Sequence, residues 1–134
     1  MAVMYLLDTN ICIYIINKKP QSVIEKIKTL KPSQVKLSSI SVGELEYGAS
    51  KSINREKNRI ALIDFISAFD ILPFDDGDAE IYGLIRATLE KSGEVIGPYD
   101  MQIAAQAISN DLILVTNNEK EFKRIRNIKI ENWV

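Results

Sequence analysis

Short apolar runs alternate with amphipathic helical segments along the chain, and this alternation limits the fold more than any other feature. Each run is too short for a helix, so we interpret it as a buried strand. The predicted strands cover residues 3–7, 35–38, 70–74, 112–115 and, more weakly, 128–130. Strands separated by helices predict an α/β fold with a central, mainly parallel sheet of four or five strands covered on both faces.

Apolar residues recur at helical spacing between the predicted strands. A first helix should end at Ile16 and be capped by Thr9 or Asn10. A second should carry Pro20 in its first turn. Further helices are predicted over residues 41–49, 54–69, 78–91, 98–110 and 119–125.

The composition is that of an ordinary soluble globular protein, with 134 residues, 46% hydrophobic and 26% charged. This length predicts one domain, residues 1–134, with a substantial core. No apolar run approaches the ~20 residues of a membrane span. The first apolar run has no basic leader, which argues against a secretory signal and for a cytoplasmic protein.

The chain has no histidine and a single cysteine, Cys12, which excludes several kinds of chemistry. A Ser-His-Asp triad, a Cys-His pair, an internal disulfide and a cysteine-based zinc site are all ruled out. We interpret Cys12, between two isoleucines, as a small core residue. Acid–base chemistry must therefore come from carboxylates, lysine, tyrosine or metal-bound water.

Three isolated acids, Asp8, Glu44 and Asp100, stand at the edges of apolar segments. Asp8 follows the first strand, and Glu44 and Asp100 are expected in the first turns of their helices. The polar cluster Thr116-Asn117-Asn118 follows the fourth strand. Sites in parallel sheets form outside the carboxyl ends of the strands, so these positions should meet there. Carboxylates gathered in one place repel unless a cation lies between them, and Mg²⁺ or Mn²⁺ prefers such oxygen ligands.

Each acid also has a purely structural interpretation. Asp8 is a plausible turn or cap residue, and Ser41-x-x-Glu44 matches the capping box. Asp100 would complement the positive end of its helix dipole. Thr116-x-x-Glu119 is a second candidate capping box. The metal-site hypothesis rests on the combination, because a carboxylate buried after Leu6-Leu7 needs a partner and no lysine or arginine is adjacent.

The net charge is −1, which does not indicate a basic domain that binds nucleic acid over its whole surface. The basic residues nevertheless gather in three groups, within residues 18–36, 51–59 and 120–129. They are either solvated helix faces or a basic rim that steers phosphates toward an acidic, metal-loaded centre.

Four motifs in this order resemble the PIN-domain ribonucleases, and more closely the VapC toxins of bacterial toxin–antitoxin pairs. They are Leu6-Leu7-Asp8-Thr9-Asn10, Ser38-Ser39-Ile40-Ser41-Val42-Gly43-Glu44-Leu45-Glu46-Tyr47-Gly48, Gly97-Pro98-Tyr99-Asp100-Met101-Gln102-Ile103-Ala104 and Val115-Thr116-Asn117-Asn118-Glu119-Lys120-Glu121-Phe122. The resemblance spans essentially the whole chain. It implies a three-layer α/β/α sandwich that cleaves RNA with a divalent metal, forms homodimers and is inhibited by a VapB-type antitoxin.

The same resemblance implies roles for individual residues. Asp8 and Asp100 would bind Mg²⁺, or Mn²⁺ as a substitute, and Glu44 would bind it directly or through water. The family's fourth acid, in a Thr-x-Asp pattern, falls on Asn118, which is left as a weak ligand through water with Thr116 in support. This departure leaves open whether one or two metals bind.

The resemblance also suggests a substrate among the structured RNAs of translation, with the anticodon loop of initiator tRNA as the leading candidate. Tyr47 and Tyr99 flank the acids and are candidates for stacking on a base; the alternative is that both are half-buried packing residues. Helix faces at residues 11–16 and 60–69 offer apolar surface for an antitoxin or a second subunit. Two other functions stay open: an Asp-x-Asp-type phosphatase or phosphotransferase, although position 10 is Asn, and a catalytically silent interaction module.

Overall fold

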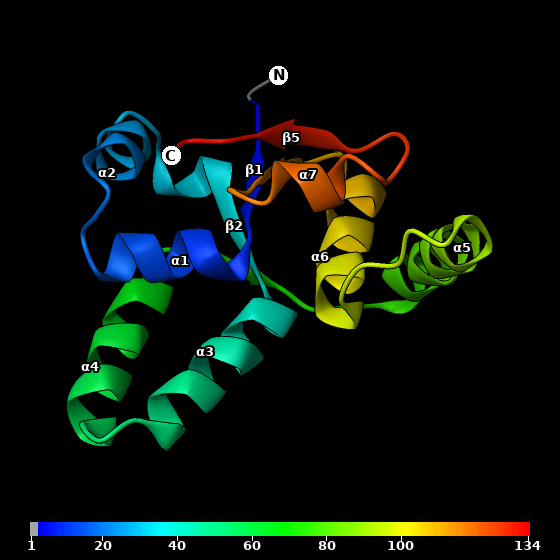
Figure 1. Ribbon diagram of the computed structural model, residues 1–134. Helices are drawn as coiled ribbons and strands as arrows, with labels where there is room; N and C mark the ends of the chain where they lie inside the picture. The colour runs from blue at the N-terminus through cyan, green and yellow to red at the C-terminus, as the bar shows by residue number, and fades with distance from the viewer. Residues whose placement is uncertain (1–2) are drawn as a thin grey trace.

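The computed structural model describes residues 3–134 and is built around a five-stranded parallel sheet with the strand order β3-β2-β1-β4-β5 (Figure 1). The strands are β1 (Tyr5–Leu7), β2 (Val35–Ser38), β3 (Asp70–Leu72), β4 (Ile113–Val115) and β5 (Lys129–Glu131). In the central register, Leu7 lies between Leu37 and Val115. The predicted α/β class and parallel sheet are confirmed, and all five strands fall within a few residues of their predicted positions.

Seven α-helices connect and cover the strands within the described residues. They are α1 (Thr9–Ile16), α2 (Gln21–Lys28), α3 (Ser39–Lys51), α4 (Arg55–Ile66), α5 (Asp76–Ser92), α6 (Pro98–Ser109) and α7 (Glu119–Phe122), with a 3-10 turn η1 (Pro32–Gln34) before β2. The last helix is shorter than predicted, and Pro20 precedes the second helix as its N-cap. Within residues 3–134, no helix has the length and apolar character needed to cross a bilayer.

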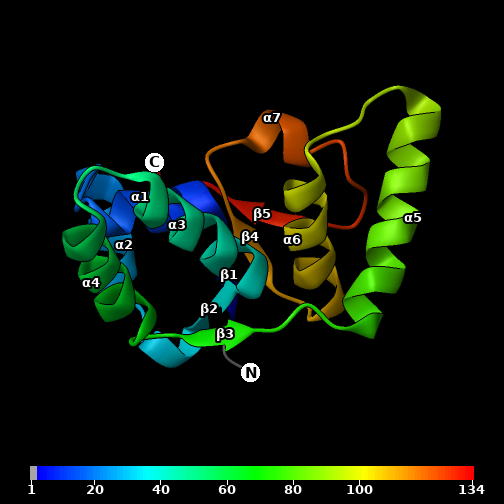
Figure 2. The ribbon, with the colours of Figure 1, turned by 90° about the horizontal axis from the view of Figure 1, so that it is seen from below.

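The sheet separates two hydrophobic cores, which gives the predicted three layers (Figure 2). Side chains alternate between the faces along each strand. Leu6 and Leu114 face a core with residues of α5, α6 and α7. Leu7 and Leu37 face the other core, which includes residues of α1, α2, α3 and α4 as well as the buried Cys12. The prediction that Cys12 is a core residue is confirmed.

Two helix starts differ from the sequence prediction. The cap of α1 is Asp8, whose Oδ1 accepts a hydrogen bond from the Ile11 amide at 2.9 Å, so the expectation of Thr9 or Asn10 was wrong. The cap of α3 is Ser38, whose Oγ accepts from the Ile40 amide at 3.0 Å. The helix therefore begins two residues before Ser41, and the predicted Ser41 capping box does not form. Glu44 consequently lies in the second turn of α3 and its carboxylate is not used in a cap.

The predicted box at Thr116-x-x-Glu119 does not form either. Thr116 Oγ1 accepts a hydrogen bond from the Asn118 amide at 2.9 Å, which makes a tight turn after β4. Asn118, not Thr116, then occupies the position before α7. A side chain that closes a turn two residues ahead competes with one that caps a helix, and here the turn forms.

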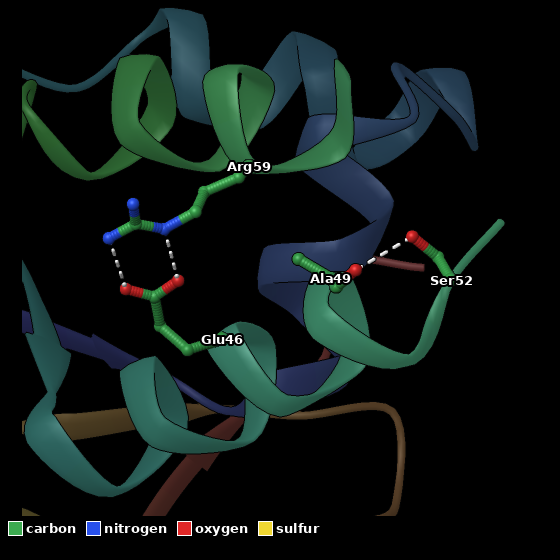
Figure 3. A network of polar contacts seen from close by, with 4 residues as sticks. All are labelled: Glu46, Ala49, Ser52 and Arg59. Carbon is green, nitrogen blue, oxygen red and sulfur yellow. Dashed lines mark hydrogen bonds and ion pairs between the residues drawn. The ribbon is translucent and has the colours of Figure 1, made fainter. Parts of the chain in front are cut away.

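One polar contact joins α3 to α4, and another closes the end of α3 (Figure 3). The Arg59 guanidinium donates from Nε and Nη2 to the two carboxylate oxygens of Glu46, at 3.2 and 3.4 Å. At the end of α3, Ser52 Oγ donates to the Ala49 carbonyl at 2.7 Å. A bidentate arginine–carboxylate pair fixes the relative orientation of its two side chains better than a single hydrogen bond does. The outer half of α3 is thus held at a defined position relative to α4.

Candidate active site

The predicted site residues lie at the carboxyl edge of the sheet, where β1 and β4 end side by side. From β1, the chain order runs outward through β2 and β3 on one side, and β4 and β5 lie on the other. Such a reversal leaves a crevice between the two strand ends, because the connecting helices leave in opposite directions. Asp8 follows β1 directly and Thr116 follows β4 directly.

Asp8 is almost fully buried, with 5% of its surface exposed. Its backbone amide donates to the Val115 carbonyl at 3.0 Å, which fixes it against the end of β4. Burial raises the pKa of Asp8 and the charge of Glu44 adds to this, while hydrogen bonds from the Thr116 side chain and the Ile11 amide act in the opposite direction. Thr116, itself buried, therefore supports the ionised form of Asp8.

Glu44 reaches the same edge from α3. Thr9 Oγ1 lies 2.8 Å from Glu44 Oε1 and donates to it, and the same hydroxyl lies 3.0 Å from Ser41 Oγ. Ser41 is fully buried and so anchors this chain of hydroxyls to the protein. The carboxylate of Glu44 is thereby oriented by a residue that directly follows Asp8.

Asp100 lies in the first turn of α6, as predicted. Its pKa is raised to about 6, first by burial and then by the negative charges of Asp8, Glu44 and Glu121. Repulsion of this kind acts only over short distances in a protein. The structure thus brings Asp8 and Glu44 close enough to Asp100 for their charges to raise its pKa, although the three acids are far apart in sequence.

Glu121 is the residue that the sequence analysis missed. It lies on α7, where the Asn118 side-chain amide donates to its Oε2 at 2.8 Å. The available signal was the spacing of three residues between Asn118 and Glu121, which places both on one face of a helical turn. Asn118 therefore does more than replace the family's fourth acid. Its side chain also positions Glu121, which is another acid of the cluster.

The donor set fits a hydrated divalent cation. Within residues 3–134, no three His, Cys, Asp or Glu side chains are close enough together to form a ready-made ligand group. Mg²⁺ commonly binds through one or two carboxylates and keeps several waters, so a tight three-residue cage is not required. Burial raises the pKa of Asp8 and of Asp100, and the charges of neighbouring acids add to both shifts. A cation bound there would favour the ionised forms of both carboxyl groups.

The two tyrosines that flank the acids are exposed, at 66% for Tyr47 and 58% for Tyr99. The interpretation of both as half-buried packing residues is therefore wrong. Both line an open groove of about 870 Å³ that also includes Glu44.

Part of the predicted basic rim is already paired. The paired cations are Lys36 with Asp70 at 2.7 Å, Arg59 with Glu46 at 3.2 Å and Lys129 with Asp111 at 2.8 Å. All three pairs include side chains exposed to solvent, where such contacts contribute little to stability. These three cations are accounted for by local pairs, and Lys51 remains as a cation at the edge of the groove.

Comparison with known proteins places this site in a family. Residues 5–128 match the PIN domain family. The chain is 46% identical over 130 residues to Ribonuclease VapC2 of Rickettsia felis, covering 96% of this chain and 97% of that protein. It is 44% identical over 129 residues to the tRNA(fMet)-specific endonuclease VapC of Salmonella typhimurium, with the same coverage of 96% and 97%.

Solved structures agree with the sequence comparison. The fold superposes with a TM-score of 0.92 on a chain of VapBC2 from Rickettsia felis bound to a promoter DNA fragment, at 44% identity and with 98% and 100% of the two chains covered. It gives a TM-score of 0.93 with DNA-bound VapBC from Salmonella typhimurium, at 42% identity over 99% and 100% of the chains. The chain with the acidic cluster described above is therefore a member of the PIN domain family and, within it, of the VapC ribonucleases.

Proposed function

We propose that this protein is a metal-dependent endoribonuclease that hydrolyses RNA phosphodiester bonds as the toxin of a type II toxin–antitoxin system. The observation that carries the proposal is the convergence of Asp8, Glu44 and Asp100 at one sheet edge, where burial and then the charges of Asp8 and Glu44 raise the pKa of Asp100 to about 6. The kinship with proteins named as VapC ribonucleases gives that cluster its chemistry.

Asp8 and Asp100 would hold a Mg²⁺ ion, with Mn²⁺ as a substitute, and Glu44 would contact it directly or through water. Asn118 would contribute only through water. The ion, when bound, supplies positive charge that offsets the charge of the phosphate and makes a nearby water more acidic. The buried position of Asp8 and the hydrogen bond from Thr116 keep one ligand fixed at the bottom of the site.

The chain's own groups account for positioning and proton movement. Thr9 orients the Glu44 carboxylate through Oε1, which leaves the second oxygen to accept a proton from the attacking water. Attack by water does not need the ribose 2′-hydroxyl. We therefore expect products with a 5′-phosphate and a 3′-hydroxyl.

We propose an initiator tRNA, cut in its anticodon loop, as the substrate. The support is the 44% identity to an enzyme named as a tRNA(fMet)-specific endonuclease. Unpaired loop bases are also the parts of a folded RNA that a protein reads most readily. A cytoplasmic location, where such an RNA is found, goes with this proposal.

We propose a VapB-type antitoxin and a second copy of this chain as protein partners. Solved relatives are VapBC complexes. Exposed apolar side chains on α1 and α4, namely Ile13, Ile60 and Ile63, offer surface for such contacts. An antitoxin arginine placed among the acids would substitute its charge for that of the metal.

The test is induced expression followed by mapping of new RNA ends, with the parent chain compared with Asp8→Asn and Asp64→Asn. Asp64 is an exposed acid on α4 and serves as the matched control. The proposal expects one set of Mg²⁺-dependent 5′-phosphate ends with the parent and Asp64→Asn, and none with Asp8→Asn. New ends that persist in Asp8→Asn, or a parent that produces none, would contradict it.

A further inference from the structure

A groove beside the acidic cluster has the features of a nucleoside-binding subsite. It lies between α1 and α3, has a volume of about 870 Å³ and is closed on one side by Tyr99 at the start of α6. Figure 1 shows α3 running beside α1, with the two helices in contact. Glu44 lines the groove, so an occupant would sit directly next to the proposed reaction centre.

One face of α3 forms the wall of this groove. The residues of that face are Ile40, Gly43, Glu44, Tyr47, Gly48 and Lys51, and each of them lies three or four positions from another member of the set. Such spacing places them in a single stripe along a helix. The core-facing side of the same helix carries Leu45 and Ala49 instead. Apart from Ile40, which packs against the core on the side of α5 and α6, the stripe belongs to neither hydrophobic core.

Two glycines leave the middle of this wall without side chains. A Cβ atom added to Gly43 or Gly48 would meet nothing within 4 Å, so neither glycine is required by packing inside the protein. Glycine is disfavoured within helices, and a local packing reason for it is absent here. At Gly43 and Gly48 the open space faces the groove, so it is available to an external group.

The polar and aromatic groups around that space suit a nucleotide. The Tyr47 ring is 66% exposed and has Lys51 Nζ 4.8 Å from its centre. An exposed ring offers a face on which any base can stack, and a lysine beside it can pair with a phosphate. A purely apolar partner would leave the Lys51 charge without a counterpart. The chemistry of the groove thus favours an RNA nucleotide.

We infer that this groove holds one unpaired nucleotide of the RNA next to the cleaved bond, with its base stacked on Tyr47 and a neighbouring phosphate paired with Lys51. The inference rests on the ribonuclease function proposed above and identifies the part of the site that binds the RNA substrate. Gly43 and Gly48 leave the space that the sugar and base fill. Tyr99 bounds the groove on the side of Asp100.

Binding can be measured without cleavage in an Asp8→Asn background, by fluorescence anisotropy with a fluorescein-labelled RNA stem–loop in Mg²⁺. Removing the ring with Tyr47→Ala should weaken binding about tenfold, whereas Tyr47→Phe should bind like its parent. Lys51→Ala should lower the slope of log Kd against log salt by about 0.7, the value for one phosphate contact on a single strand. Lys91→Ala on α5 is the matched lysine control and should leave the slope unchanged.

Gly43→Leu tests the space itself, since a side chain there fits the protein but fills the groove. Gly83→Leu is its control, because Gly83 also has nothing within 4 Å of an added Cβ and lies on α5, away from α3 (Figure 2). Both variants should melt at or above the temperature of the parent, because leucine is favoured over glycine within a helix. Only Gly43→Leu should weaken RNA binding, by roughly tenfold.

A set of stem–loops, each lacking the base of one loop nucleotide, locates the stacked base. The Tyr47→Ala effect should vanish with one of these RNAs and persist with the others. The subsite would be overturned if Tyr47→Ala weakened binding equally on every RNA. It would also be overturned if the Tyr47→Ala and Gly43→Leu variants bound and cleaved RNA like the parent. Either result would leave the nuclease function intact. A parent chain that cleaves no RNA would instead contradict the proposed function.

Discussion

At the scale of single residues, Asp8 serves both the fold and the site. Its Oδ1 caps α1 through the Ile11 amide, and its burial places a carboxylate at the bottom of the acidic cluster. A structural role and a metal-binding role were alternatives in the sequence, since either explains an aspartate after a strand. The structure shows that the cap forms and that the charge also acts on Asp100. The two interpretations therefore do not exclude each other.

Asp100→Asn should inactivate the enzyme and stabilise the metal-free protein. Turnover should fall by about 10²- to 10⁴-fold, because a charged group at the reaction centre is lost. The melting temperature without metal should rise, since a partly buried charge that repels Asp8 and Glu44 disappears. Asp64→Asn, at an exposed acid, should change neither RNA cleavage nor calorimetric melting. A lower melting temperature for Asp100→Asn would contradict the proposed repulsion.

The raised pKa of Asp100 also predicts how stability depends on pH. Asp100 has a pKa of about 6 in the folded protein and its ordinary value of 3.8 in the unfolded chain. Its contribution to the free energy of unfolding is therefore fully present below about pH 4 and is lost as pH rises through 6. Asp100 is partly exposed, so solvent screening reduces the effect to about 1 kcal/mol. Urea unfolding of the metal-free parent and Asp100→Asn at pH 4.5 and 7 measures it. A parent-minus-variant difference that is the same at both pH values would count against this prediction.

The sequence could locate some site residues and not others. The positions of Asp8 and Asp100 could be predicted because each directly borders a strand end or a helix start, and those ends meet in a parallel sheet. The hydrogen bond between Thr9 and Glu44 joins residues 35 positions apart, which no local pattern encodes. Glu121 was missed because its role depends on where the short helix α7 lies against α6.

At the scale of secondary-structure elements, the start of α3 decides what Glu44 can do. Ser38 and Ser41 are both good cap residues three positions apart, and the capping-box pattern favoured Ser41. Ser38 prevails because it ends β2, where the strand must stop, and because its hydroxyl also donates to the buried Gln106 Oε1. This second contact is tertiary and therefore invisible in the local sequence.

Ser38→Ala should lower the free energy of unfolding by about 2–3 kcal/mol. It removes the N-cap of α3 and leaves the Gln106 amide oxygen buried without this donor. Ser67→Ala is the control, because Ser67 is an exposed serine at the end of α4 whose hydroxyl bonds the Asp64 carbonyl. Urea unfolding followed by circular dichroism measures both variants. Equal stabilities for the two would show that the Ser38 contacts contribute little.

The strands were predicted more accurately than the helix ends. The three inner strands, β1, β2 and β4, are buried along most of their length, and their apolar pattern is strong even over three or four residues. The edge strands β3 and β5 are more exposed. Helix ends depend on competition between neighbouring caps and turns, as with Thr116, whose hydroxyl closes a turn onto the Asn118 amide. Errors therefore gather at the helix starts that border the site.

At the scale of the whole molecule, the end of the chain closes one core over the first strand. β5 pairs with β4 at the sheet edge, and Trp133 packs edge-on against Tyr5 with their ring centres 5.4 Å apart. Trp133 Nε1 donates to Glu131 Oε1 at 3.0 Å, so its polar atom is satisfied. The two ends of the described chain are thus joined through one aromatic contact.

Trp133→Ala should lower the free energy of unfolding by about 3–5 kcal/mol, the usual cost of removing a large buried aromatic side chain. Trp133→Phe should recover part of that loss by refilling the space next to Tyr5. Val134→Ala, at an exposed neighbour, should stay close to the parent. Urea unfolding followed by circular dichroism measures all three, and a small effect of Trp133→Ala would show that the chain end adds little to the core.

We propose that Asp8, Glu44 and Asp100 together hold one hard divalent cation. Isothermal titration calorimetry of the parent, Asp8→Asn, Glu44→Gln, Asp100→Asn and the control Asp64→Asn with Mg²⁺ and Mn²⁺ tests it most directly. We predict saturable binding by the parent and Asp64→Asn, and at least about tenfold weaker binding when any one of the three acids is neutralised. Unchanged affinity in the three site variants, or no saturable binding by the parent, would contradict the account.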